Sequence, residues 1–280
     1  MNRRDFLKKL GGSMVLLSSG LLGSEWEHGN KNYWGKGIFK QSNIDTSKVE
    51  TENIVKIYIE GEWKSYKLVE LPEKYIDWNL KRRINDIKGI KKGKMPQLSG
   101  PHNAAIASYG NKRKDSNFSI NNAIKGTGMV PKKEKVGTII EKIEKTKNNP
   151  LPEKLEILQS LYEDRNNWDM RKQLSLELYS QPDFETHSFL NIMEYPIVSI
   201  VYLDVPSFEL RCAAKMIHPN DKDASQYEKE VVKYTNLIHS YFHGKFSKDF
   251  IGMIFHVIEV FDNSPGKMKG IRVKPVLNVK

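Results

Sequence analysis

The sequence predicts an α+β protein with an antiparallel, barrel-like β domain, flanking helices, and a basic, partly irregular region in front of them. Three observations carry this prediction. Segments rich in Val, Ile, Tyr and Leu, typical of buried strands, gather in the carboxy-terminal half. Helical segments stand before and between these strands rather than alternating with each of them. The stretch that precedes this half is dominated by Gly, Lys and Asn.

These changes in composition divide the chain of 280 residues into four expected parts. The order is a signal segment, a linker, a basic amino-terminal region, and a region of helices plus the barrel-like domain. We expect their boundaries at 1–24, 25–50, 51–135 and 136–280.

The basic amino-terminal region begins with regular structure. Two runs of β-branched and aromatic residues, 53–60 and 63–70, flank a Gly-Glu pair and predict a hairpin. A proline then begins a predicted helix over 72–87. Residues 88–135 contain six glycines, many Lys and Asn, and little periodic hydrophobicity. We therefore expect a long loop there, which would be a functional lid, a surface wrap or partly disordered.

Apolar periodicity becomes stronger from Val136 onward. It predicts, in chain order, helices over 136–147, 152–164 and 166–179, strands over 197–203 and 208–217, a helix over 224–241, and strands over 251–261 and 271–277. The third of these helices takes its apolar positions from Trp168, Met170, Leu174, Leu176 and Leu178.

The first residues carry a targeting pattern. Arg3 and Arg4 precede Phe6 and Leu7, and an uncharged stretch rich in Leu, Gly and Ser follows over 10–24. The pattern resembles a twin-arginine export signal, which is read by the twin-arginine export machinery. That resemblance implies a protein exported in a folded state to a periplasmic or extracytoplasmic location.

Two alternatives to a cleaved signal stay open: the stretch could begin a buried helix, or it could remain as an uncleaved anchor. It is too short to predict a permanent membrane span, for which about 20 apolar residues are expected. Cys212 is the only cysteine, so no internal disulfide can form. This agrees with folding in the cytoplasm before export.

The net charge of +11 is unevenly distributed. Residues 1–150 hold 29 Lys and Arg against 16 Asp and Glu, whereas residues 151–280 hold 16 against 18. A basic region is the electrostatic footprint of nucleic-acid binding, but export makes a nucleic-acid partner implausible. We expect a solvated lysine-rich surface, with contact to a membrane surface or an acidic partner as the functional alternative.

A polar cluster stands directly before a Tyr-Pro step and a buried strand. It consists of Thr186, His187, Ser188 and Asn191, whose side chains could hydrogen-bond a phosphate or a ring edge at the mouth of a sheet. The alternative is structural, with Thr186 to Ser188 capping a short helical segment over 189–193.

This stretch resembles the pyridoxamine-phosphate-oxidase-like FMN-binding split barrels, in which a His-Thr-x-Asn-Leu run precedes Asn-Pro and a hydrophobic strand. The corresponding run is His187-Ser-Phe-Leu-Asn191, followed by Tyr195-Pro196, with one extra residue before the Asn. A later strand over 210–215, an acidic helix and a final strand follow the same order. The resemblance covers about residues 150–278.

The resemblance implies a six-stranded antiparallel split barrel and a homodimer with flavin near the subunit interface. FMN contacts would then come from Thr186, His187, Ser188, Asn191, Arg211 and Lys215. The protein would then be an exported flavin-type redox protein, an FMN-dependent oxidoreductase whose substrate the sequence does not indicate. The alternative is a cofactor-free periplasmic binding or accessory protein that is exported folded.

A second cluster lies near the end of the helix predicted over 224–241. His239 and His243 are four residues apart, so they share one helical face and could bind zinc or offer a haem ligand. The structural alternative is that Gly244 ends the helix and that the helix dipole favours histidines in its last turn. Haem is therefore the alternative cofactor to FMN.

Overall fold

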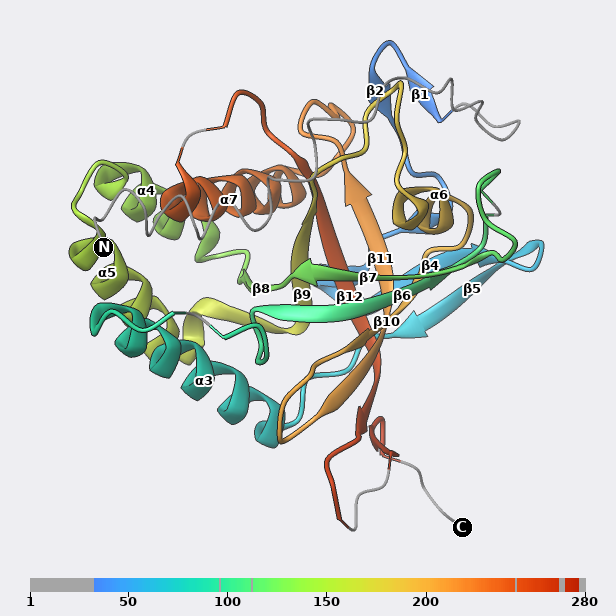
Figure 1. Ribbon diagram of the computed structural model, residues 1–280. Helices are drawn as coiled ribbons and strands as arrows, with labels where there is room; N and C mark the ends of the chain where they lie inside the picture. Colours follow the sequence, from blue (N-terminus) through green and yellow to red (C-terminus); the bar gives the residue numbers. More distant parts are fainter. Residues whose placement is uncertain (1–32, 96, 112, 245, 267–269, 277–280) are drawn as a thin grey trace.

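The computed structural model describes residues 33–276 apart from positions 96, 112, 245 and 267–269 (Figure 1). The predicted signal segment lies outside the described residues. The described residues form helices around an antiparallel sheet, which confirms the α+β prediction. None of their helices is both long and apolar enough to cross a membrane.

The amino-terminal part contains short strands and one long helix. In chain order the elements are β1 (Trp34–Gly35), β2 (Ile38–Phe39), β3 (Ile44–Asp45), α2 (Val49–Glu52), β4 (Ile54–Ile59), β5 (Glu62–Lys67) and α3 (Glu73–Lys91). The hairpin and the following helix are therefore confirmed.

The rest of the chain builds the main sheet and the remaining helices. Its elements are β6 (Asn103–Tyr109), β7 (Ile120–Gly126), β8 (Gly128–Pro131), α4 (Val136–Thr146), α5 (Leu151–Glu163), η1 (Arg165–Asn167), β9 (Trp168–Glu177), α6 (His187–Glu194), β10 (Ile197–Val201), β11 (Phe208–Ile217), α7 (Gln226–His243), β12 (Ile251–Asp262) and β13 (Ile271–Lys274).

The main sheet closes on itself into a six-stranded antiparallel barrel. Its strand order is β7-β6-β10-β11-β12-β9-β8, with β13 added beside β12. Only Thr127 separates β7 from β8, so the two behave as one long strand. The first part of that strand pairs with β6 and the second part with β9. One strand thus joins both edges of the sheet, which makes the domain split-barrel-like and removes most of its open edges.

The long loop predicted over 88–135 is wrong, because β6, β7 and β8 all lie within it. In β6 the buried positions alternate with less buried ones, and of the three buried residues, Ala104, Ile106 and Ser108, only Ile106 is large and apolar. In β7 exposed side chains alternate with partly buried ones, so the segment carries little hydrophobicity. Strand β6 pairs with β10 and strand β8 pairs with β9, which are both far away in the sequence. The local composition does not indicate the stability that this pairing gives.

The helix predicted over 166–179 is also wrong, because this segment is strand β9. The apolar residues that suggested a helix, from Trp168 through Leu176, stand mostly at even spacing, which is the period of a strand. Polar residues between them are buried as well, because β9 is covered on both faces. The hydroxyls of Tyr75 and Tyr202 lie 3.3 and 3.2 Å from Gln173 Oε1, and both donate to it.

The other predicted elements are confirmed with small shifts of their ends. Helix α7 begins at a capping box, in which Ser225 Oγ accepts from Glu228 N and the Glu228 carboxylate accepts from Ser225 N. The turn between β4 and β5 is formed by Glu60 and Gly61 at positive φ of 54° and 84°, one residue earlier than the expected Gly-Glu pair.

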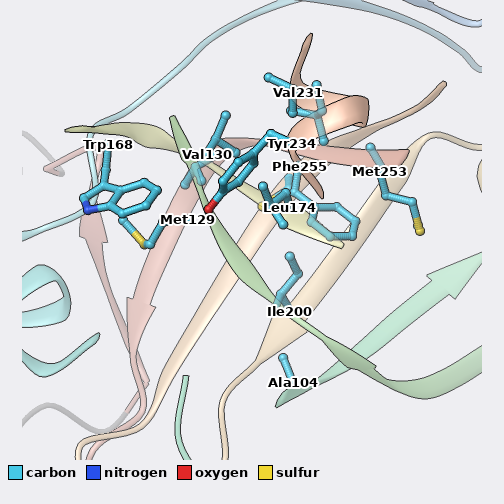
Figure 2. Packing of buried hydrophobic residues seen from close by; sticks show 14 of the residues in the cluster. Ala104, Met129, Val130, Trp168, Leu174, Ile200, Val231, Tyr234, Met253 and Phe255 are labelled. Atoms are coloured by element: carbon cyan, nitrogen blue, oxygen red, sulfur yellow. The ribbon is translucent and has the colours of Figure 1, made fainter. Parts of the chain in front are cut away.

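One hydrophobic core joins the barrel to the helices around it. Figure 2 shows part of it, with Val231 and Tyr234 of α7 beside Leu174 of β9 and Phe255 of β12. Gly252 of β12 allows α7 to approach closely, since an added Cβ there would lie 2.7 Å from the side chain of Val232. Helix α7 therefore covers the outer face of β9 and β12.

The small sheet of β3, β4 and β5 forms a second cluster on the barrel surface. Its buried Val55 and Ile57 pack with Ala213 of β11, while Ile258 of β12 and Ile197 of β10 complete the contact. This small sheet thus covers the part of β10, β11 and β12 to which these residues belong.

Candidate functional site

The four polar residues predicted before the buried strand do come together, at the beginning of α6. Thr186 is the residue before the helix, and its Oγ1 accepts a hydrogen bond from Phe189 N at 3.1 Å. The hydroxyl of Ser180 donates to the same Oγ1 at 3.2 Å and accepts from Thr186 N at 3.1 Å. The capping role weighed from the sequence is therefore present.

The side chains of His187 and Ser188 point away from α6, toward the β6–β7 connection and strand β7. His187 Nε2 lies 2.9 Å from Asn111 O, so this nitrogen carries a proton and donates it. Ser188 is buried, and its hydroxyl accepts from Asn121 Nδ2 at 2.9 Å. Both side chains thus join α6 to the β6–β7 hairpin.

Asn191 completes this junction from a fully buried position. Its Nδ2 donates to Ser108 Oγ at 3.2 Å and to Ser119 O at 3.1 Å. Its Oδ1 accepts from Asn111 N at 2.8 Å. We call Thr186, His187, Ser188 and Asn191 with these partners the α6 junction. Its polar atoms are engaged by the protein itself, and the FMN contacts expected of them stay a prediction.

Arg211 and Lys215 lie on β11 and bond to none of the four α6 residues within the described chain. The Arg211 guanidinium donates to Glu209 Oε1 at 2.9 Å and lies over the ring of Phe261, 4.2 Å from its centroid. Lys215 Nζ lies 3.4 Å from Gln41 O, and burial lowers the pKa of Lys215. A bulge between Arg211 and Cys212 interrupts the strand register between them. The structure therefore does not gather all six predicted residues at one place.

The predicted histidine pair lies at the end of α7, where the chain turns toward β12. The ring centroids of His239 and His243 are 4.7 Å apart. Phe246 stacks on His239 at 4.9 Å with planes inclined by 20°, and Phe250 meets it edge-on at 6.1 Å. We call these four residues the α7 ring cluster. Neither imidazole forms a hydrogen bond with any other described residue.

Both imidazoles of the α7 ring cluster are neutral near pH 7. Desolvation by burial, followed by the charge of His243, lowers the pKa of His239 to about 4. Desolvation also lowers the pKa of His243. A neutral imidazole presents a nitrogen lone pair, which is the form that binds metal ions. This site can therefore act as a donor of one or two nitrogen ligands.

A cleft that sequence reasoning missed lies between α2, the beginning of α3, the β8–α4 connection and β9. Its volume is about 620 Å³, and most of its lining residues are charged, among them Glu50, Glu134, Lys133, Arg165 and Arg171. Arg165 pairs with Glu73 at 2.9 Å across the cleft. Carboxylates and cations thus stand close together in one concave surface.

Beneath this cleft, a buried ionic cluster joins α2 to β9. Lys172 Nζ bonds to Glu50 Oε1 and lies 2.8 Å from Asp169 Oδ2. Burial alone would raise the pKa of Asp169, but hydrogen bonding from Arg171 and the charge of Lys172 outweigh it and lower the pKa. The Asp169 carboxylate is therefore ionised throughout the physiological range.

His256 of β12 lies beside this cluster, opposite Lys172 across the strand pair. It is buried, and neither of its ring nitrogens has a hydrogen-bond partner among the described residues. Burial, and next the charge of Lys172, lowers the pKa of His256 to about 3. The imidazole is therefore neutral and carries an uncompensated polar group in the interior.

The run Asp169-Met-Arg-Lys172 was the one signal for this region in the sequence, since three charged residues interrupt an apolar segment. The helix predicted over 166–179 would place such residues on a solvated face. Only the pairing of β9 with β12 shows that Lys172 and Asp169 are buried.

Comparisons with known proteins give no family. No family model matches the chain, and no curated protein does. Among solved structures, HutZ, the heme storage protein from Vibrio cholerae, is similar at 10% identity and a TM-score of 0.30. The matched part covers 58% of this chain and 86% of HutZ. A likeness of this size carries no argument about function, and the barrel assignment above rests on strand pairing.

Proposed function

We propose that the protein binds haem at the end of α7, with His239 or His243 supplying a nitrogen ligand to the iron. The observation that carries the proposal is the pair of neutral imidazoles, whose rings are apposed and form no hydrogen bond within the described chain. Histidine is a common axial ligand of haem iron.

The aromatic neighbours fit the shape of the ligand. Phe246 and Phe250 flank His239 with one ring stacked and one edge-on. Flat aromatic rings beside a nitrogen donor suit a planar, largely apolar macrocycle. Bound there, haem would supply electron-transfer or oxygen chemistry, while the protein would set the iron's ligand and its exposure to water.

The export prediction agrees with this proposal. Arg3, Arg4, Phe6 and Leu7 form the twin-arginine pattern, outside the described residues. A route that carries folded chains permits a cofactor to be inserted before export. We therefore propose a periplasmic or extracytoplasmic haem-binding protein.

The test is a titration of the purified chain with ferric haem, followed by the Soret band. We expect saturation near one haem per chain, and at least about tenfold weaker binding when His239 and His243 are both replaced by Ala. His187→Ala is the matched control, because His187 is a partly exposed histidine whose ring donates to Asn111 O instead. Loss of the Soret shift in H187A, or its survival in the double variant, would overturn the assignment to α7.

The same preparation tests FMN, the cofactor that the resemblance implies. A protein that carries flavin after purification would be yellow and fluorescent, and binding would then fall in T186A and H187A. The bonds already made by the α6 junction lead us to expect no such binding.

A second candidate function is the cofactor-free binding of a small zwitterion. The mixed-charge cleft of about 620 Å³ favours it, because Lys133 and Glu134 line the cleft without a described ion pair. Thermal shift measurements with amino acids would test this candidate. A rise in Tm that is lost in K133A and E134Q would support it, and a rise retained in both variants would contradict it.

A further inference from the structure

Two neighbouring loops expose the three least buried large apolar side chains of the described residues. Leu98 is 89% exposed, Leu203 80% and Val205 75%. The first lies in the α3–β6 connection and the other two in the β10–β11 connection. Gly100 N donates to Leu203 O at 3.2 Å, so the two loops touch. We call these three residues the apolar tip.

The loops that carry the apolar tip are held in place from below. Trp78 Nε1 donates to Asp204 Oδ2 at 3.1 Å, and Ser207 Oγ donates to Tyr202 O at 3.0 Å. Arg82 of α3 bonds to Gln97 in one loop and lies 3.7 Å from Asp204 in the other. Figure 1 shows the β10–β11 connection beside α3. Leu98, Leu203 and Val205 are thus presented to solvent by anchored loops.

The surface next to the apolar tip is strongly basic. The segment 88–94 carries four lysines and no acidic residue, and it leads directly to the loop of Leu98. Lys88, Lys92 and Lys94 are exposed and form no ion pair within the described chain. Lys81 is also exposed, three residues beyond Trp78 on α3. Lys94 thus stands four residues before Leu98, and Lys81 stands directly before Arg82, which contacts both loops.

We propose that the apolar tip and its lysines dock the protein on an anionic phospholipid bilayer. Apolar side chains enter the interfacial layer between headgroups and acyl chains, while nearby lysines are attracted by anionic headgroups. The apolar residues stand on protruding loops instead of lining a groove. A deformable lipid interface can surround such protrusions, whereas a folded acidic partner would need a matching concave surface.

The charge arrangement selects the type of membrane. The attraction of lysine to an anionic surface is about 1 kcal/mol for each side chain near it, so three unpaired lysines correspond to about a hundredfold in affinity. The three apolar side chains alone bury too little surface for stable anchoring. Binding should therefore require anionic lipid and weaken in high salt.

The single cysteine makes a specific test possible in the full chain. Cys212 is buried, so a cysteine introduced at the surface can be labelled with a polarity-sensitive dye. Leu203→Cys places the dye in the apolar tip. Ile120→Cys is the matched control, because Ile120 is a 63% exposed apolar residue of β7 that pairs with Tyr109, at the end of β6 opposite to these loops.

With vesicles of phosphatidylglycerol and phosphatidylcholine, the dye at position 203 should shift to the blue and the dye at position 120 should not. Vesicles of phosphatidylcholine alone should give no shift. Replacing Lys88, Lys92 and Lys94 together by Glu should weaken vesicle binding at position 203 by about a hundredfold or more. Two results would overturn the proposal. One is vesicle binding with no blue shift at either position, which is expected if the amino-terminal apolar segment alone binds the lipid. The other is an equal blue shift at both positions.

Discussion

The α6 junction and the α7 ring cluster both contain histidines that the sequence marks for cofactor binding, yet they differ in one respect. At the α6 junction, His187, Ser188 and Asn191 are bonded to groups of the β6–β7 hairpin. At the α7 ring cluster, His239 and His243 have ring contacts and no hydrogen bonds within the described chain. A polar cluster whose bonds are satisfied internally stabilises a fold, whereas unbonded neutral imidazoles are available to a ligand.

The largest expected effect comes from removing the centre of the α6 junction. Asn191→Leu would leave Asn111 N without its acceptor, and it would remove the Asn191 amide as a donor to the buried Ser108 Oγ. We expect the free energy of unfolding to fall by about 2–4 kcal/mol. Urea denaturation measures this loss, and Asn122→Leu on the exposed side of β7 is the control. A loss below about 1 kcal/mol would show that the junction is not structural.

The next effect is a loss of stability in acid caused by histidines whose pKa is lowered by burial. His256 has a pKa lowered to about 3, and His239 one lowered to about 4, against 6.5 for a free imidazole. Because the unfolded chain takes up these protons first, stability is full above about pH 6.5 and falls as the pH drops toward these folded-state values. The slope is at most about 1.4 kcal/mol per pH unit for each group.

His256→Leu should flatten this acid dependence, because the substitution removes the titrating group and its unpartnered nitrogens. The measurement is the free energy of unfolding at a series of pH values between 7 and roughly 4.5. Asn122→Leu, on the exposed side of β7, provides the comparison and should keep the slope of the natural chain. An unchanged slope in H256L would mean that His256 is solvated in solution.

A smaller effect is expected at the cap of α6. Thr186→Ala removes the acceptor for Phe189 N and should cost about 1 kcal/mol, whereas Thr186→Ser should restore most of it. Thermal unfolding of the two variants measures the difference. If T186A lowered the free energy of haem or flavin binding by more than it lowered the free energy of unfolding, the α6 junction would be a ligand site.

The smallest effect on stability is expected at the α7 ring cluster. His243→Ala removes an exposed side chain without a hydrogen bond, so the free energy of unfolding should change by less than about 0.5 kcal/mol. Haem affinity should nevertheless fall in this variant or in H239A. If H243A lost as much stability as N191L, the α7 ring cluster would be as structural as the α6 junction.

The sequence predicted most helices and the strands of the carboxy-terminal half, because their apolar periodicity is strong. It failed at β9, where apolar and charged residues are both buried, and at β6 to β8, where alanine and asparagine dominate. In both cases the strand state depends on a paired neighbour that lies far away in the chain.

The candidate site divides in the same way. The sequence indicated that Thr186 could cap a helix and that His239 and His243 share a helical face, since both features are local. It did not show the cleft, the buried pairing of Lys172 with Glu50, or the unpartnered His256. Each of these depends on residues from separate elements that folding brings together.

By itself, then, the sequence determined local properties of this protein: a twin-arginine pattern, the positions of most helices and of the strands β4, β5 and β10 to β13, a single cysteine and a basic amino-terminal half. The tertiary structure decided how the barrel closes through Thr127, and which polar side chains are already bonded. His187 and its acceptor Asn111 are 76 residues apart, and Lys172 and Glu50 are 122 apart. Short-range patterns determine the backbone preference. Whether a histidine side chain forms a structural hydrogen bond or stays available to a ligand depends on partners that are close only in the folded chain.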